Sequence, residues 1–191
     1  GDIAYSIVTA SATSADANYS GGSAADVSLT NVDDDTAGIT ISPTSGLTTT
    51  EAGGTATFTV VLTSQPTANV TIPLSSSNTA EGTVSLTNLV FTPSNWNTPQ
   101  TVTISGVDDS VVDGDTNYSI VTAAATSTDA NYNGRNPSDV SVRNLDDDVA
   151  GITVTPTSGL VTSEAGGATS FTVALNSRPT ANVVIGLASS K

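Results

Sequence analysis

The chain has 191 residues and a formal net charge of −14, because 18 acidic residues stand against four basic ones, Arg135, Arg143, Arg178 and Lys191. So few cations leave no basic patch to neutralise phosphates, which excludes nucleic acid and anionic membrane surfaces as expected partners. Cys, His and Met are absent, so disulfide, zinc–thiolate and imidazole chemistry is excluded as well.

The composition also bears on where the protein works. An acidic chain without cysteine and rich in Thr, Ser, Gly and Asn fits an exported bacterial or archaeal protein, so we expect an extracellular or cell-surface location. No apolar run approaches the roughly 18 residues of a membrane span, and no signal peptide is recognisable. Because Met is absent, Gly1 is not a retained translation start, and we expect a processed product or part of a longer polypeptide.

An internal repeat organises the sequence. The segment GDIAYSIVTASATSADANY at Gly1–Tyr19 returns as GDTNYSIVTAAATSTDANY at Gly114–Tyr132. The segment GITISPTSGLTTTEAGG at Gly38–Gly54 returns as GITVTPTSGLVTSEAGG at Gly151–Gly167. Both offsets are 113 residues, the size of an independent domain rather than a solenoid unit of about 20–50 residues.

This repeat predicts three modules in chain order. Residues 1–37 form the C-terminal part of one module, residues 38–150 form a complete module, and residues 151–191 form the N-terminal part of a third. The two partial pieces together do not make a module, because counterparts of Thr79 to Asp113 are missing. A tandem array cut at arbitrary points explains this arrangement.

The complete module has the pattern of short strands, because its apolar residues alternate with period two between turn signals. The predicted strands are GITIS at 38–42, TATFTVVL at 55–62, ANVTIPL at 68–74, GTVSL at 82–86, NLVF at 88–91, QTVTI at 100–104, NYSIV at 117–121 and DVSV at 139–142. In the segment 82–86 the alternation points Val84 and Leu86 toward the core. About seven or eight such strands in about 110 residues predict an all-β protein of tandem immunoglobulin-like β-sandwich modules.

Acidic residues gather at one end of this predicted sandwich. If the strands are lettered A to G, the A–B, C–D and E–F connections share one pole with the end of strand G. Nine carboxylates of the complete module fall at this pole: Glu51, Glu81, Asp108, Asp109, Asp113, Asp115, Asp146, Asp147 and Asp148. Only Asp129 and Asp139 of this module lie elsewhere, near the F–G connection.

Such a cluster needs a counter-ion. Two unit charges about 4 Å apart repel by roughly 1 kcal/mol in water and about 4 kcal/mol at an effective dielectric constant of 20. Calcium accepts about six to eight oxygen ligands in flexible geometry, magnesium keeps more water, and transition metals prefer imidazole or thiolate. We therefore predict Ca²⁺, with about two to four ions at the pole. The alternative is a solvated acidic face, and convergence from four separate loops argues against it.

Three segments of the complete module resemble the Calx-beta domain and its relatives, which occur as tandem repeats in large bacterial surface proteins: TEAGGTATFTV at 50–60, FTPSNWNTPQTVTISGVDDSVVDGD at 91–115 and VSVRNLDDD at 140–148. The resemblance covers essentially the whole chain and implies calcium at the pole that these segments form. Carried over by position, the implied ligands are Glu51, Asp108, Asp109, Asp113, Asp115 and Asp146 to Asp148. The partial modules contribute their equivalents, Asp2, Asp33, Asp34, Asp35 and Glu164.

We expect no enzymatic activity. An activated Ser or Thr would lack a base, since His and Cys are absent and the sole Lys is the last residue. Paired carboxylates can hydrolyse glycosides, but these lie in short loops without an aromatic cleft for a sugar.

Three functions remain open. The first is a calcium-binding structural repeat of an extracellular adhesin or filament, in which calcium stiffens the array because only two residues, Thr36–Ala37 or Val149–Ala150, follow each DDD run. The second is a subunit of a fibre that self-assembles through the partial modules. The third is a glycan- or protein-binding adhesive module. The expected partners are thus neighbouring modules, copies of the same chain, or a glycan or protein ligand.

The aromatic residues give further expectations. Trp96 is predicted to cap the core beside the D–E turn, with a carbohydrate platform as the alternative. Tyr118, and Tyr5 with it, are predicted to form a tyrosine corner. Tyr19 and Tyr132 in the F–G loop are predicted to contact a neighbouring module or, failing that, a ligand.

Overall fold

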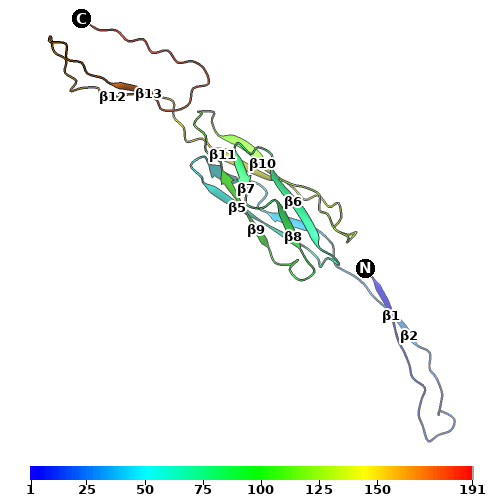
Figure 1. Cartoon of the computed structure of the whole chain (residues 1–191). Helices are drawn as coiled ribbons and strands as arrows, with labels where there is room; N and C mark the ends of the chain where they lie inside the picture. The colour runs from blue at the N-terminus through cyan, green and yellow to red at the C-terminus, as the bar shows by residue number, and fades with distance from the viewer. Residues whose placement is uncertain (191) are drawn as a thin grey trace. The chain divides into compact units, whose positions relative to one another are not determined.

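The computed structural model describes residues 1–190, in which strands occur but no helix (Figure 1). Within that range no helix is long and apolar enough to cross a membrane. The chain divides into two compact units, residues 1–36 and the residues from Ala37 onward. The second unit contains a β-sandwich, so the predicted all-β, immunoglobulin-like fold class is confirmed.

One mixed sheet and one antiparallel sheet form this sandwich. The strands, in chain order, are β3 (Ile39–Ser42), β4 (Leu47–Thr50), β5 (Thr55–Leu62), β6 (Val70–Ser76), β7 (Gly82–Val84), β8 (Asn88–Phe91), β9 (Gln100–Gly106), β10 (Thr116–Thr122) and β11 (Val140–Leu145). One sheet has the order β4-β11-β10-β6-β8, and the other has the order β3-β5-β9-β7. All pairings in the two sheets are antiparallel except that of β4 with β11.

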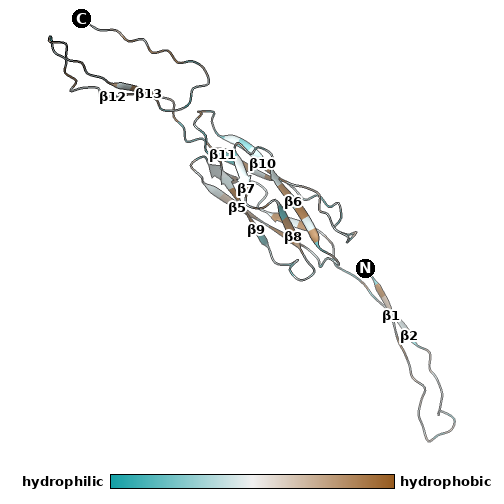
Figure 2. Ribbon diagram, in the orientation of Figure 1, coloured by the Kyte–Doolittle hydropathy of each residue, from teal (hydrophilic) through white to brown (hydrophobic). Residues whose placement is uncertain are grey.

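The core lies between the sheets because alternate residues of each strand point inward. Along β6, Val70, Ile72 and Leu74 are buried while Thr71 and Pro73 are only partly covered, and Figure 2 shows the same alternation as changes in hydropathy. The buried apolar residues are Phe58, Val60, Leu62, Val70, Ile72, Leu74, Leu89, Phe91, Val102, Ile104, Tyr118, Ile120, Ala125, Tyr132, Val140 and Val142. Trp96 packs against this cluster, so its predicted place at the edge of the core is confirmed.

The first predicted strand is followed by a second strand that the sequence pattern did not indicate. Residues 43–46 form a turn after β3, and Gly46 allows it because its φ angle is +77°. The chain then enters the opposite sheet, where β4 pairs in parallel with β11, from Leu47 opposite Val142 to Thr50 opposite Leu145. The N-terminal edge of the module is therefore shared between both sheets.

The prediction that Leu86 faces the core is wrong. Strand β7 ends at Val84, and Leu86 remains 42% exposed. The chain crosses between sheets here: the Ser85 N–H donates to the Thr103 carbonyl of β9, while the Leu74 N–H of β6 donates to the Thr87 carbonyl. This crossing interrupts the period-two alternation.

Two tyrosines have roles other than those predicted. Tyr132 is only 1% exposed, and its hydroxyl donates to the Ser64 carbonyl at 2.6 Å. It is a core residue, so the prediction that it contacts a neighbouring module or a ligand is wrong. The Tyr118 hydroxyl bonds the Thr49 side chain at 3.2 Å rather than nearby backbone, so the tyrosine corner is wrong as well.

The end segments repeat parts of this pattern. In the first unit, β1 (Ile3–Ile7) pairs with β2 (Val27–Asn31) in the register of β10 with β11. In the second unit, β12 (Ile152–Thr155) pairs with β13 (Thr172–Leu175) in the register of β3 with β5. All four of these strands are exposed along their whole length. The division into modules at residues 37/38 and 150/151 stays a prediction.

Candidate metal centre

Three carboxylates meet at one end of the sandwich. Glu51, Asp146 and Asp148 each offer a ligand oxygen, and these oxygens lie within 4.8 Å of one another. Glu51 directly follows β4, and Asp146 directly follows β11. Because β4 and β11 run parallel, their carboxyl ends lie at the same end of the sheet. The Glu51 N–H extends this pairing by donating to the Leu145 carbonyl at 3.0 Å.

Glu51 is the buried member of this group. Its side chain is 3% exposed, and within residues 1–190 its Oε2 atom has no hydrogen-bond partner. Burial, followed by the charges of Asp146, Asp109 and Asp113, raises the pKa of Glu51 from 4.5 to about 7. A buried carboxylate oxygen without a partner is costly, and a bound cation would remove that cost.

Asp146 and Asp148 are held by backbone groups. The Asp146 carboxylate accepts the Gly114 N–H at 2.7 Å and the Asp148 N–H at 2.8 Å, and these bonds lower its pKa. Loss of hydration, and then repulsion from Asp146 and Asp109, raises the pKa of Asp148. The Oδ2 atom of Asp148 is a second buried oxygen without a hydrogen-bond partner in the described chain.

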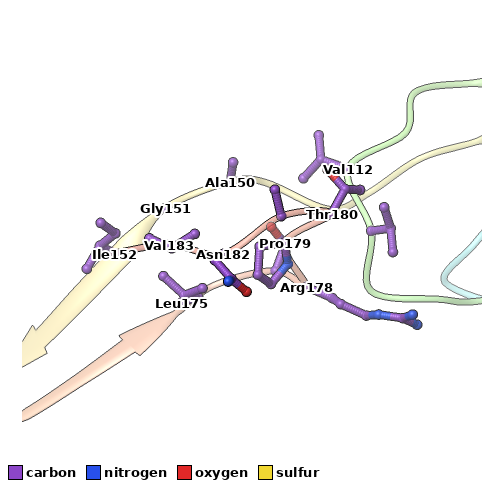
Figure 3. A pocket seen from close by; sticks show the side chains of 13 residues that line it. Val112, Ala150, Gly151, Ile152, Leu175, Arg178, Pro179, Thr180, Asn182 and Val183 are labelled. Carbon is purple, nitrogen blue, oxygen red and sulfur yellow. The ribbon is translucent and has the colours of Figure 1, made fainter. Parts of the chain in front are cut away.

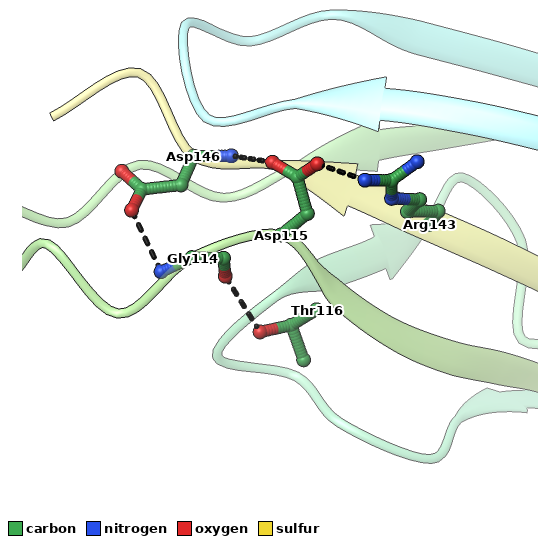
Figure 4. Close-up of polar contacts among 5 residues, drawn as sticks. All are labelled: Gly114, Asp115, Thr116, Arg143 and Asp146. Atoms are coloured by element: carbon green, nitrogen blue, oxygen red, sulfur yellow. Dashed lines mark hydrogen bonds and ion pairs between the residues drawn. The ribbon is translucent and has the colours of Figure 1, made fainter.

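Asp115 orients this group rather than joining it. One of its oxygens accepts the Asp146 N–H at 3.1 Å, and the other forms an ion pair with Arg143 (Figure 4). Both oxygens are therefore engaged by the protein. The role of Arg143 could not be predicted from the sequence, because it depends on how β10 and β11 align.

The remaining predicted ligands of the module surround the three carboxylates. Glu81 is buried, and its Oε2 accepts the Asn144 amide at 3.2 Å. The exposed ones are Asp108, Asp109, Asp113 and Asp147. All of the outer acids act on the central group through their charge: Glu81, Asp109 and Asp113 on Glu51, and Asp108, Asp109 and Asp147 on Asp148.

The end segments contain fragments of the same arrangement. The Asp33 N–H donates to the Asp2 carboxylate at 2.9 Å, and the Asp35 N–H donates to the Asp33 carboxylate at 3.1 Å. These two hydrogen bonds repeat those from the Asp146 N–H to Asp115 and from the Asp148 N–H to Asp146 in the complete module. Asp34 and Glu164 are exposed. Among residues 1–190, no second group of three such side chains meets the distance that defines the central one.

Asn144 is a buried polar residue at the base of this site that the sequence analysis missed. The signal was present, because alternation along VSVRNL places Asn144 on the same inward face as Val140 and Val142. A polar side chain in that position requires buried partners.

The raised pKa of Glu51 predicts how the metal-free protein responds to pH. Unfolded protein releases this proton near pH 4.5, whereas folded protein retains it to about pH 7. The stabilising effect is therefore complete below pH 4.5 and is lost as the pH rises to about 7. We expect the unfolding temperature, measured in chelator, to fall across this interval for the natural protein. In the variant Glu51→Gln the unfolding temperature should fall less over this pH interval, because the variant has no carboxyl group at residue 51. The same dependence of unfolding temperature on pH in both proteins would contradict the raised pKa of Glu51.

No protein-family model matches the chain, and no curated protein matches it. The solved structures that are similar include the apo-form Calx CBD1 domain, with 20% identity over 58% of this chain and 96% of that one at a TM-score of 0.45. The calcium binding domain CBD12 of CALX1.1 has 21% identity over 61% and 49% at a TM-score of 0.46. Domains 4 and 5 of the S-layer protein SbsC have 20% identity over 64% and 58% at 0.36.

Proposed function

We propose that the module of residues 38–150 binds calcium through Glu51, Asp146 and Asp148, and that calcium stiffens an extracellular array of such modules. The observation that carries the proposal is the buried Oε2 of Glu51, which has no hydrogen-bond partner in the described chain and belongs to a group of carboxylates within 4.8 Å. The proposed role is structural and non-catalytic.

The donor set favours calcium over other cations. Carboxylate oxygens are hard ligands, so the site suits Ca²⁺ or Mg²⁺ rather than metals that prefer nitrogen or sulfur. Three carboxylates, with exposed Asp109 and Asp113 close enough to perturb Glu51, favour the ion that tolerates many oxygens and irregular geometry. Extracellular calcium modules with dissociation constants of about 10⁻⁴–10⁻³ M are loaded outside cells and empty in the cytosol.

The position of the site supports the proposed stiffening role. Asp146 to Asp148 lie between the end of β11 and the start of β12 at Ile152. An ion bound there would fix the direction in which the chain leaves the sandwich. It would also order the loop 107–115, whose Ser110 carbonyl accepts the Arg178 N–H of the following segment at 2.6 Å.

Calcium titration tests the binding. At a free calcium concentration 100 times the dissociation constant, we expect the free energy of unfolding to rise by about 2.7 kcal/mol. Isothermal titration calorimetry should show binding that is lost in Glu51→Gln and Asp148→Asn. The matched control Asp139→Asn removes the same charge away from the site, where Asp139 accepts the Thr122 N–H, and should bind normally. Equal calcium affinity in all four proteins would contradict the proposed site.

Small-angle scattering tests the stiffening. We expect the 191-residue chain in calcium to scatter as a more rigid and more extended particle than the same chain in chelator. Identical profiles in the two conditions, with calcium binding shown by calorimetry, would leave a calcium site without a stiffening role.

A second candidate, assembly into fibres, is favoured by the exposed apolar residues of the end segments. Ile3, Tyr5 and Ile7 are exposed on β1, although Tyr118 and Ile120, the repeat equivalents of Tyr5 and Ile7, are buried. Near Val112, the second unit also has a cavity of ≈ 600 Å³ without any carboxylate in its lining, which includes Ile152, Leu175 and Val183 (Figure 3). Copies of the chain could join through such faces by completing each other's sheets. Sedimentation as a monomer at high concentration would exclude this candidate.

No comparable observation favours the glycan-binding alternative, because Trp96 packs against the core.

A further inference from the structure

A buried polar network lies directly beneath the three carboxylates. Its centre is Asn144 on β11, which is 1% exposed. An amide in this position would lose several hydrogen bonds to water on folding, so its burial is tolerated only where the protein replaces them. The side chain of Asn144 has partners on both its oxygen and its nitrogen.

The directions of these hydrogen bonds are fixed by the atoms involved. The Thr49 hydroxyl donates to Asn144 Oδ1 at 2.9 Å. Because that hydroxyl has only one proton, the Tyr118 hydroxyl must be the donor in its 3.2 Å contact with Thr49. On the other side, Asn144 Nδ2 donates to Glu81 Oε2 at 3.2 Å and to the Val107 carbonyl at 3.4 Å.

Each partner of the amide lies next to an acidic residue of the site. Thr49 is two residues before Glu51, and Asn144 itself is two residues before Asp146. Since residues i and i+2 of an extended chain point to the same side, holding Thr49 and Asn144 in place also holds Glu51 and Asp146 on that side. Val107 immediately precedes Asp108 and Asp109, and Glu81 is itself one of the acids.

One side chain thus connects the chain segments that bring the acids together. These segments are β4, β11, the connection from β6 to β7, and the loop after β9. Coulomb repulsion among the acids pushes these segments apart when no cation is bound. The hydrogen bonds of Asn144 oppose that separation without using any of the oxygens in the group of three.

We propose that Asn144 is a positioning residue that sets the calcium affinity of the site without contacting the ion. The proposal rests on the calcium site proposed above. Hydrogen-bond partners outside the ligand shell commonly change metal affinity by about 10–100-fold when they are removed. We therefore expect Asn144→Ala to raise the calcium dissociation constant by at least about tenfold.

The experiment compares two ways of breaking the network with a control at the other end of the sandwich. Asn144→Ala removes the amide. Thr49→Val keeps the shape of the side chain and removes only the hydroxyl that donates to Asn144. The control Tyr132→Phe also removes a buried hydrogen bond, to Ser64, but Tyr132 lies in the connection between β10 and β11, at the opposite end of these strands from the acids of the site. Calcium affinity is measured by calorimetry at a temperature where chelator-treated samples of each variant are folded by circular dichroism.

We expect both network variants to bind calcium more weakly and the control to bind within about twofold of the natural protein. The double variant should bind no more weakly than Asn144→Ala alone, because both changes break one network. Additive losses, or normal affinity in a folded Thr49→Val or Asn144→Ala protein, would overturn the role of Asn144. The calcium site itself fails separately, if Glu51→Gln binds calcium like the natural protein.

Discussion

Replacing Gly106 by alanine is expected to lower the free energy of unfolding by more than about 3 kcal/mol and to abolish calcium binding. A Cβ atom at this position would lie 2.1 Å from the Thr50 carbonyl oxygen and 2.7 Å from Asn144 Oδ1. Neither neighbour can yield freely. Thr50 is held by the parallel pairing of β4 with β11, and Asn144 is held by its buried hydrogen bonds.

The clash would force β9 away from the edge where β4 and β11 meet, and the carboxylates extend from that edge. Urea unfolding in chelator measures the stability, and calorimetry measures calcium binding. Gly186→Ala is the matched control, because a Cβ there meets nothing within 4 Å and its φ angle is not in the left-handed region. If Gly106→Ala unfolds at the same urea concentration as the control, the close approach described here is wrong.

Tyr132→Ala is expected to lower the free energy of unfolding by about 3–5 kcal/mol, because it leaves a cavity where the largest fully buried side chain stood. The less drastic Tyr132→Phe keeps the ring but leaves Ser64 without the hydroxyl that its backbone N–H and side chain contact, for a cost of about 1–3 kcal/mol. The two costs separate the packing of the ring from its hydrogen bonds.

Both tyrosine variants should leave calcium affinity unchanged, because Tyr132 and Ser64 lie in connections at the end of the sandwich opposite the acids. Thermal and urea unfolding in chelator measure the two stabilities against the natural protein. A surface role for Tyr132 predicts instead that both variants unfold like the natural protein.

Most of the sandwich could be predicted because most of its strands contain their own signal. Residues such as Phe58 and Val60, or Val102 and Ile104, alternate with polar neighbours within a single segment, and the pattern does not depend on what the segment packs against. The gathering of acids at one pole follows from the order of the strands alone. It could therefore be predicted without knowing which residues pair across neighbouring strands.

The features that were missed depend on contacts between distant segments. Tyr132 stands in the polar sequence TDANYNGRN and has no local sign of burial, because its partner Ser64 is 68 residues away. The selection of Glu51, Asp146 and Asp148 from nine acids depends on β4 pairing in parallel with β11. The sequence contains no periodic signal for β4, whose four residues LTTT include only one large apolar side chain.

The parallel pairing of β4 with β11 also determines how the module resists tension. The chain enters the module through β3, continues into β4 and leaves at the end of β11, so a pull on the two ends of the module slides β4 and β11 past each other lengthwise. The hydrogen bonds between the two strands are then loaded together in shear, instead of breaking one after another. A divalent ion held between Glu51 and Asp146 would lie across the same seam and would resist the same sliding, so an array of these modules would be mechanically strongest when its metal sites are full.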